Sequence, residues 1–324
     1  MIQAEIIADS LSPHGTRCTT FVLTMPRIVL AEFNTHRMIS RNSASSRAVP
    51  FKKMVKRVKE NPFVPIKWMK DHSGMQGDEY FGEEQSGRLA AEWLHARDAA
   101  VAYAEILNAR GVTKQFINRL LEPFMWHTVI ATATDWENFF ALRAHGAAEI
   151  HIQKLAFIML TRYNNSLPKQ LKAGEWHIPF GDKFDRGRLD QLFEYEHGFD
   201  DDWSEQDIKE MFDTLKIKIA TARCARVSYI NYEGKDDYQA DIKLHDRLVK
   251  MGHWSPFEHC AKAMNDDEYT NHFRGKLAAG CKTFQDSPMY YRGWSGNFKG
   301  FLQYRKMFNG ENKRDERVQT PQLY

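Results

Sequence analysis

The sequence predicts an α/β (α+β) fold in which a mixed or antiparallel sheet is flanked by long helices. Residues 2–9 and 17–25 are rich in β-branched side chains and are separated by turn residues, which favours two strands. Segments 126–134 and 259–264 are strand-like as well. Apolar residues recur at helical spacing in four long segments, 87–110, 147–163, 204–223 and 238–251. Prolines, capping residues and amphipathic spacing predict four shorter helices: 26–36 from Pro26, 51–60, 113–122 between Thr113 and Pro123, and 136–144 capped by Asp135.

The composition is typical of a soluble globular protein and excludes several other classes. The chain of 324 residues is 43% hydrophobic and 27% charged, well outside the disordered range. Its net charge of +3 gives no general nucleic-acid or membrane signal. No apolar run approaches the ~20 residues that span a bilayer, and the N-terminus lacks a signal-peptide pattern. The cysteines form no C-x-x-C pair, so reduced thiols in a cytoplasm are expected at Cys18, Cys224, Cys260 and Cys281.

The stretch 34–50, N-T-H-R-M-I-S-R-N-S-A-S-S-R-A-V-P, stands out for its polarity. It holds three arginines, a histidine and four serines. Such a segment is not expected to form a core strand, and its hydroxyl and amide groups compete for backbone hydrogen bonds in a helix. The guanidinium and hydroxyl groups suit a bound phosphate or carboxylate. A solvated loop is the alternative, but the apolar run 26–33 would hold the stretch against a core.

Further polar clusters surround Arg119 and segments 135–143, 225–229 and 251–259. Asn138 and Arg143 lie about 140° apart around a helix, so they are expected to face different neighbours. Arg143 has an alternative role in complementing a helix dipole. Cys224 lacks an evident His or Asp partner, so a buried structural thiol is expected rather than a nucleophile. Core or capping roles are the alternative for the histidines, and no known metal-site spacing is matched by His253, Glu258 and His259.

The polar stretch carries a specific resemblance. His36-Arg37-x-x-Ser40-x-Asn42-x-x-Ser45-x-Arg47 resembles, at identical spacing, the signature R-H-R-x-x-S-x-N-x-x-S-x-R of flavin-dependent thymidylate synthases. Six of its seven constant positions agree. Downstream, R-L-L-E-P (119–123) and N-F-F-A-L-R-A (138–144) look like the family's nucleotide and flavin segments.

Two more blocks resemble the family but stand in another order. A-R-V-S-Y (225–229) and G-H-W-S-P-F-E-H (252–259) look like blocks that precede the signature in the family and here follow it. The strand ending near Met264 is expected to be continued by residues 19–25. The chain therefore resembles a circularly permuted, phage-type member, with one catalytic domain over 1–324. Its expected parts are 1–164 with the signature loop and helices, 204–264 as the permuted flavin-binding part, and 265–324 as a C-terminal extension.

The resemblance implies an activity, cofactors and partners. The family makes dTMP from dUMP with methylenetetrahydrofolate as carbon donor and FADH2, regenerated by NADPH, as reductant. It needs no cysteine nucleophile, and by position Arg143 would polarise the uracil ring. A homotetramer is implied, in the cytoplasm or the host cytoplasm if phage-encoded, with no metal, membrane or nucleic-acid partner.

The resemblance also implies contacts residue by residue. The dUMP ligand would contact Glu32, Thr35, Ser45, Ser46, Arg47, Arg119 and Arg143. FAD would contact His36, Arg37, Ser43, Thr132, Thr134, Asn138, Ser228, His253, Ser255 and Glu258.

Two departures from the family pattern keep other functions open. Thr35 replaces an arginine, and Glu32 stands where a neutral amide is common. Arg292 or Arg305 is the hypothesised source of the missing charge. The same departures allow dCMP as substrate or a C5 hydroxymethyl product. A non-catalytic nucleotide- or RNA-binding relative is the remaining alternative.

Overall fold

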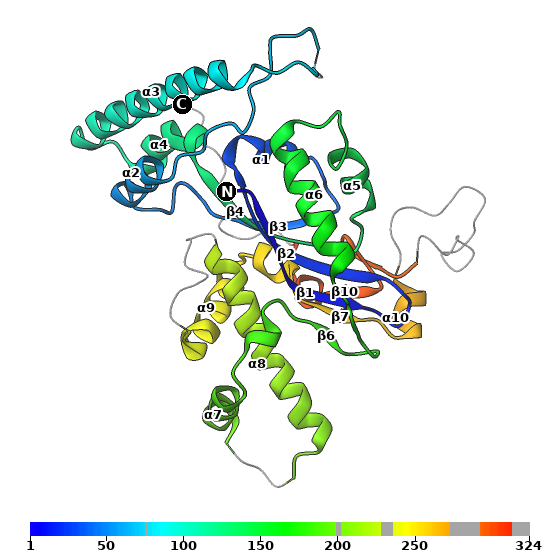
Figure 1. The fold of residues 1–324 in the computed structure, drawn as a ribbon. Helices are drawn as coiled ribbons and strands as arrows, with labels where there is room; N and C mark the ends of the chain where they lie inside the picture. Colours follow the sequence, from blue (N-terminus) through cyan, green and yellow to red (C-terminus); the bar gives the residue numbers. More distant parts are fainter. Residues whose placement is uncertain (75–76, 199–201, 228–235, 273–291, 313–324) are drawn as a thin grey trace, which may run out of the picture.

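A five-stranded mixed sheet forms the centre of the computed structural model, which describes residues 1–74, 77–198, 202–227, 236–272 and 292–312 (Figure 1). The strand order is β3-β4-β2-β1-β5, and the neighbours are antiparallel except for the parallel pair β1 and β5. The α/β class and the mixed sheet predicted from the sequence are therefore confirmed. The strands are β1 (Gln3–Leu11), β2 (Arg17–Pro26), β3 (Ser40–Ser43), β4 (Trp126–Ala133) and β5 (Lys169–Gln170).

Helices cover both faces of this sheet. In the part of the chain that the structure describes, four are long: α3 (Glu83–Ala109), α6 (Ile150–Asn165), α8 (Glu205–Arg226) and α9 (Tyr238–Met251). Six are shorter: α1 (Leu30–Phe33), α2 (Phe51–Glu60), α4 (Lys114–Ile117), α5 (Glu137–Arg143), α7 (Arg186–His197) and α10 (Asp266–Asn271). Ser204 caps α8 in a reciprocal capping box with Asp207, which explains why its start was predictable. Within the described ranges, no helix is both long and apolar enough to cross a membrane.

The remaining strands make two small sheets. β7 (Ala261–Ala263) lies between β6 (Trp176–His177) and β10 (Phe301–Gln303), and β8 (Trp294–Ser295) pairs with β9 (Phe298–Lys299). The predicted continuation of the strand ending near Met264 by residues 19–25 is wrong as a strand contact. β7 and β2 belong to different sheets, and Cys18 of β2 lies in the same buried cluster as Ala261 and Ala263 of β7.

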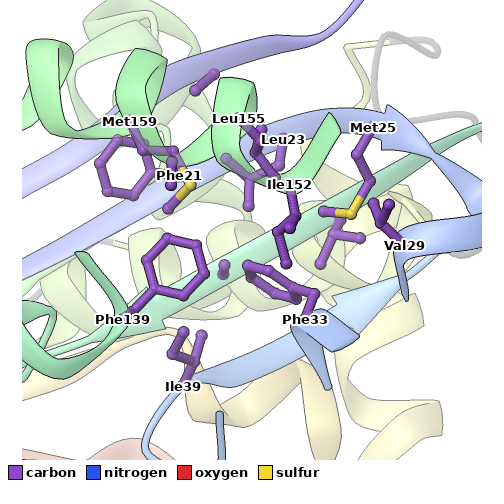
Figure 2. Close-up of a cluster of buried hydrophobic side chains, with 14 of the residues drawn as sticks. Phe21, Leu23, Met25, Val29, Phe33, Ile39, Phe139, Ile152, Leu155 and Met159 are labelled. Atoms are coloured by element: carbon purple, nitrogen blue, oxygen red, sulfur yellow. The ribbon is translucent and has the colours of Figure 1, made fainter. Parts of the chain in front are cut away.

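The main core lies between the sheet and the helices α5 and α6. Phe21 and Leu23 of β2 point to this side, where they pack with Phe139, Leu155 and other residues shown in Figure 2. The next residue along β2 faces the opposite way, because side chains alternate across a strand. There Val22 packs with Ile130 and with Cys224 near the end of α8. The sheet is thus buried on both faces, so β2 is apolar without strict alternation.

The prediction that the polar stretch forms no core strand is wrong for Ser40–Ser43. These residues form β3, an edge strand that pairs with Ile130 and its neighbours in β4. Ser40 and Asn42 are buried, but their polar groups have partners from other elements. A polar strand is stable here because its side chains are satisfied by hydrogen bonds within the fold.

Several predicted helix boundaries are also corrected. The 26–36 helix ends at Phe33, after a 3-10 turn over Arg27–Val29. The 113–122 helix splits into α4 and a 3-10 helix, Asn118–Phe124, which contains Pro123. A proline is tolerated there because it lies near the end of a short element rather than in a helix interior. The residue before α5 is Trp136, not Asp135, and Glu149 caps α6 with its side chain.

A chain of buried hydroxyl and imidazole groups crosses the sheet. Ser10 contacts His177 at 2.9 Å, and 2.8 Å bonds continue through Thr20 and Thr132 to His259. Burial lowers the pKa of His177 to about 4 and that of His259 to about 3. Both imidazoles are therefore neutral at pH 7 and serve as hydrogen-bonding parts of the core.

These histidines should make the fold sensitive to mild acid. Above pH 6.5 they are neutral in both the folded and the unfolded chain; below it, only the unfolded chain gains protons. Stability should therefore fall as pH drops from 7.5 to 5.5, by about 1 kcal/mol for each buried histidine. Urea unfolding at the two pH values measures this. Replacing the exposed His95 by glutamine should leave the pH dependence unchanged, whereas a flat profile in the natural chain would contradict the assignment.

Candidate active site

Arg143, the last residue of α5, is the centre of a polar cluster. Its Nε donates to His36 Nε2 at 3.0 Å, and its Nη1 lies 3.4 Å from Glu32 Oε2. Its Nη2 donates to the Thr35 hydroxyl at 3.4 Å. Arg143 thus contacts Glu32, Thr35 and His36, although it follows them in the chain by more than a hundred residues. All four were predicted from the sequence to bind nucleotide or flavin.

The protonation state of His36 follows from its surroundings. Burial, Arg143 and Arg41 together lower the pKa of His36 to about 4, so the ring is neutral at pH 7. A guanidinium N–H can only donate, so the Nε2 atom of His36 must accept and its proton resides on Nδ1. The ring also packs edge-on against Phe139, at 4.9 Å between centroids. His36 therefore orients Arg143 as a neutral acceptor.

A pocket of about 260 Å³ opens beside this cluster. Thr35, His36 and Arg37 line it from the signature stretch, and Asn138 and Arg143 line it from α5. The prediction that Asn138 and Arg143 face different neighbours is therefore wrong. The angular separation is real, but Arg143 is the final helical residue, and its long side chain reaches back to His36.

A second pocket, of about 490 Å³, is bordered by α1 and by the 3-10 turn before it. Arg119 lines it together with Arg27, Asn34 and Glu122. Asn34 and Thr35 are consecutive, so the two pockets adjoin along the chain. Two arginines and an amide give this second pocket the donors that a phosphate requires.

The serines of the signature lie behind this second pocket. The Ser46 hydroxyl is buried and donates to Glu122 Oε1 at 2.6 Å, while Arg27 Nη2 lies 3.5 Å from the same oxygen. Ser45 is half-buried and Arg47 is exposed. In this arrangement the Ser46 hydroxyl, which the resemblance assigns to the phosphate, is bonded to Glu122. A bound phosphate would have to replace Glu122 as the acceptor of this hydrogen bond. The assignments of Ser45, Ser46 and Arg47 remain predictions.

Asn42 joins the signature strand to the C-terminal blocks. Its Nδ2 donates to the carbonyl oxygen of Cys224 at 2.6 Å, and its Oδ1 accepts from the Ser255 hydroxyl at 3.3 Å. Cys224, the residue before A-R-V-S-Y, and the G-H-W-S-P-F-E-H block therefore both contact β3. Whether the segment order is a circular permutation remains a prediction.

Glu258 brings charge to the same region. It pairs with Arg305, which also binds Glu311 at 2.7 Å. Arg41 lies within electrostatic reach of both Glu258 and Arg37. The charge of Arg305 is thus offset by two carboxylates, so the structure gives no support to its hypothesised compensation for Thr35; the same hypothesis for Arg292, which is half-buried, is untested.

The other residues predicted to contact the flavin differ in burial and in hydrogen-bond partners. His253 and Asn138 are exposed, and Ser43 is half-buried at the end of β3. Thr132 is fully buried in the hydroxyl–imidazole chain, and Thr134 accepts from the Lys299 N–H at 2.9 Å. Ser228 lies outside the described residues. These flavin assignments remain predictions, and both threonines already have partners within the protein.

The turn between β8 and β9 was not predicted from the sequence. Asn297 donates to the Met38 carbonyl at 2.9 Å and to the Ser40 hydroxyl at 3.0 Å, and Gln303 donates to the same hydroxyl at 3.2 Å. The C-terminal extension thus holds the turn that leads into β3. Gly296-Asn297, with Gly296 at φ +62°, is a two-residue hairpin loop whose Gly-Asn pair was a usable signal.

The described thiols are not nucleophiles. Cys18, Cys224 and Cys260 are buried, and burial raises the pKa of each, to about 12 for Cys260. Since the thiolate is the reactive form, these side chains stay inert at neutral pH. This supports the expectation of a structural Cys224; Cys281 lies outside the described residues.

Fold and site together define an α/β protein with adjoining polar pockets suited to an anionic ligand. Residues 9–169 match the model of the family described as thymidylate synthase complementing protein. The chain belongs to this family, the flavin-dependent thymidylate synthases. The matched residues contain the whole signature and both pockets.

One solved structure resembles part of this chain. Among solved structures, the chain is similar to a UMP/dUMP methylase, PolB from Streptomyces cacaoi, bound with 5-Br UMP. The identity is 17% and the TM-score 0.41, with 50% of this chain and 88% of that chain covered. At this level the likeness supports no inference about this chain. No curated protein matches the chain by sequence.

Proposed function

We propose that this protein methylates C5 of a pyrimidine nucleoside monophosphate, the family's reaction being conversion of dUMP to dTMP. The carbon would come from methylenetetrahydrofolate and the reducing equivalents from FADH2, which NADPH regenerates. The observation that carries the proposal is the convergence of Arg143 with Glu32, Thr35 and His36 at a pocket lined by the family signature.

Arg143 would act on the base. A guanidinium beside the ring edge stabilises the negative charge that develops when C5 becomes nucleophilic. His36 holds the Nε side of Arg143, which leaves the two Nη groups facing Glu32 and Thr35. This restraint limits the reorganisation that Arg143 would need during the reaction.

The second pocket would hold the phosphate. Arg119 and Arg27 supply charge there, and Arg47 lies exposed on the loop that leads from Ser46. Because the consecutive residues Asn34 and Thr35 border one pocket each, a nucleotide could place its phosphate in the second pocket and its base in the first.

The residues around the first pocket fit part of a flavin. Arg37 and Asn138 offer exposed donors, His36 a neutral imidazole, and Ser255 a hydroxyl next to β3. A cavity of about 260 Å³ holds only part of a molecule as large as FAD. When bound, FAD would supply the hydride that completes the methyl group.

A homotetramer is part of the proposal, because the family shares its site between subunits. Large apolar side chains exposed near α3 and α4 support an association surface: Tyr103, Ile106, Phe116 and Leu120. A second subunit would enclose the part of FAD that the pocket of about 260 Å³ does not hold.

A product assay tests the proposed function. Purified protein should carry or take up FAD and appear yellow. With dithionite-reduced FAD, methylenetetrahydrofolate and dUMP or dCMP, mass spectrometry should find a nucleotide enlarged by one methylene unit. A hydroxymethylated product would revise the chemistry. Colourless protein that takes up no FAD and forms no product would identify a non-catalytic nucleotide- or RNA-binding relative.

A further inference from the structure

We propose that Glu32 and Arg143 recognise the pairing edge of the base by hydrogen bonds and thereby select a cytosine nucleotide over a uracil nucleotide. The inference rests on the proposed function and names its substrate class. It depends on the order in which hydrogen-bonding groups are arranged around Arg143.

The groups stand in a row. Glu32 Oε2 lies 3.4 Å from Nη1 of Arg143, and the Thr35 hydroxyl lies 3.4 Å from Nη2. Both distances exceed the usual 2.9–3.0 Å, so these contacts are loose. A guanidinium has five N–H donors, and three point to Glu32, Thr35 and His36, so two remain for a ligand.

Both carboxylate and guanidinium can be reached. The side chain of Glu32 is 40% exposed and that of Arg143 is 21% exposed. Burial and the neighbouring Glu149 raise the pKa of Glu32, which shows that its charge is only partly compensated by Arg143. A ligand that donates a hydrogen bond to Glu32 would improve this balance.

The row presents an acceptor followed by two donors. The pairing edge of cytosine offers the complement: the 4-amino donor, then the N3 and O2 acceptors. Uracil offers O4 acceptor, N3–H donor and O2 acceptor. In the same register, with position 4 at Glu32, its O4 would meet the carboxylate and its N3–H would meet a guanidinium donor. The window from Nη1 of Arg143 to Thr35 gives two donors followed by a hydroxyl, and its central group is again a donor, so it likewise supplies no acceptor in the central position.

Thr35 has no positive charge and no guanidinium donors, whereas the family has an arginine at this position. An arginine at this position would place a second guanidinium beside Glu32, whose backbone carbonyl already accepts from the Thr35 hydroxyl at 2.7 Å. With threonine, Arg143 is the cation that Glu32 contacts within the described part of the chain. The Glu32 carboxylate therefore keeps acceptor capacity for an amino group of the base.

Equilibrium binding tests the inference without turnover. Calorimetry with full-length protein saturated with FAD should give a dissociation constant for dCMP about tenfold lower than for dUMP, the size of one good base-edge contact. The deoxynucleotide monophosphate of pyrimidin-2-one lacks the 4-amino group and should bind about tenfold more weakly than dCMP. This ligand series needs no variant, so misfolding cannot obscure it.

A matched pair of variants locates the effect. Glu32→Gln has the same size, but its side-chain amide can present either its oxygen as an acceptor or its NH2 group as a donor. It can therefore pair with either base, and the dCMP and dUMP affinities should differ by no more than about threefold. Glu137→Gln is the control, since Glu137 is exposed on the same helix as Arg143 and outside both pockets; it should keep the natural ratio.

Each outcome has a distinct meaning. A preference for dCMP that is lost in Glu32→Gln supports the inference. Equal binding, or tighter binding of dUMP, overturns it and leaves the proposed function intact. Failure to bind either nucleotide, or any other pyrimidine monophosphate, overturns the proposed function and the inference with it.

Discussion

Replacing Arg143 by alanine is expected to lower turnover at least about 100-fold while leaving bound FAD in place. The guanidinium is the charged donor that would meet the developing charge on the base. It is oriented by His36 at 3.0 Å and bordered by Glu32 and Thr35, so no neighbouring cation is placed to substitute for it among these partners. Turnover of reduced enzyme and the flavin absorbance of the purified variant give the two readouts.

Two controls separate this role from stability. Arg143→Lys keeps the charge but loses the fork and the Nε donor, so its turnover should also fall strongly. Arg88→Ala removes an exposed arginine on α3 that pairs with Glu84, and it should behave like the natural enzyme. Turnover of Arg143→Ala within about threefold of the natural value would remove Arg143 from the site, since the loss of one such donor costs far more.

Changing Asn42 to aspartate is expected to destabilise the fold by about 3 kcal/mol. The buried amide donates to the Cys224 carbonyl at 2.6 Å; a carboxylate cannot donate there and would place two acceptors in contact. The other amide atom accepts from Ser255, so the change also affects the G-H-W-S-P-F-E-H block. Urea unfolding at pH 7.5 measures the loss.

The matched control for Asn42 is Asn164→Asp, because Asn164 is exposed on α6. Its unfolding free energy should stay within about 0.5 kcal/mol of the natural value. If Asn42→Asp were equally benign, β3 would not depend on its contact with the end of α8. The variant should also weaken FAD uptake, since it loosens the joint between the signature strand and the segments assigned to flavin.

Much of the fold was predictable because local signals agree with the final packing. The strands β1, β2 and β4 and the helix α9 appear almost where periodicity and turn residues put them. Predictions of secondary structure failed where contacts with distant segments outweighed the local sequence pattern. Ser40–Ser43 was too polar for a core strand on composition alone, yet Asn297, Gln303 and the Cys224 carbonyl satisfy its side chains.

The sequence proposed the residues of the candidate site, but it did not show how they are arranged. The spacing of the signature selected His36, Arg37, Ser45 and Arg47 as candidate residues, and the family match covers all four positions. The sequence could not show that Glu122 binds the Ser46 hydroxyl or that Arg305 is held by two carboxylates. These contacts join residues far apart in the chain, so no local pattern records them.

The sequence by itself determined the family, the strand pair at the N-terminus and the residues of the signature, because each depends on residue types at short, constant spacing. Only the tertiary structure decided that Glu32, Arg143 and Thr35 stand in one row, and that a C-terminal turn holds the signature strand. The physical reason is that hydrogen-bond order around a ligand depends on the packing of α5 against α1 and on side-chain reach. Neither property is encoded in any single segment.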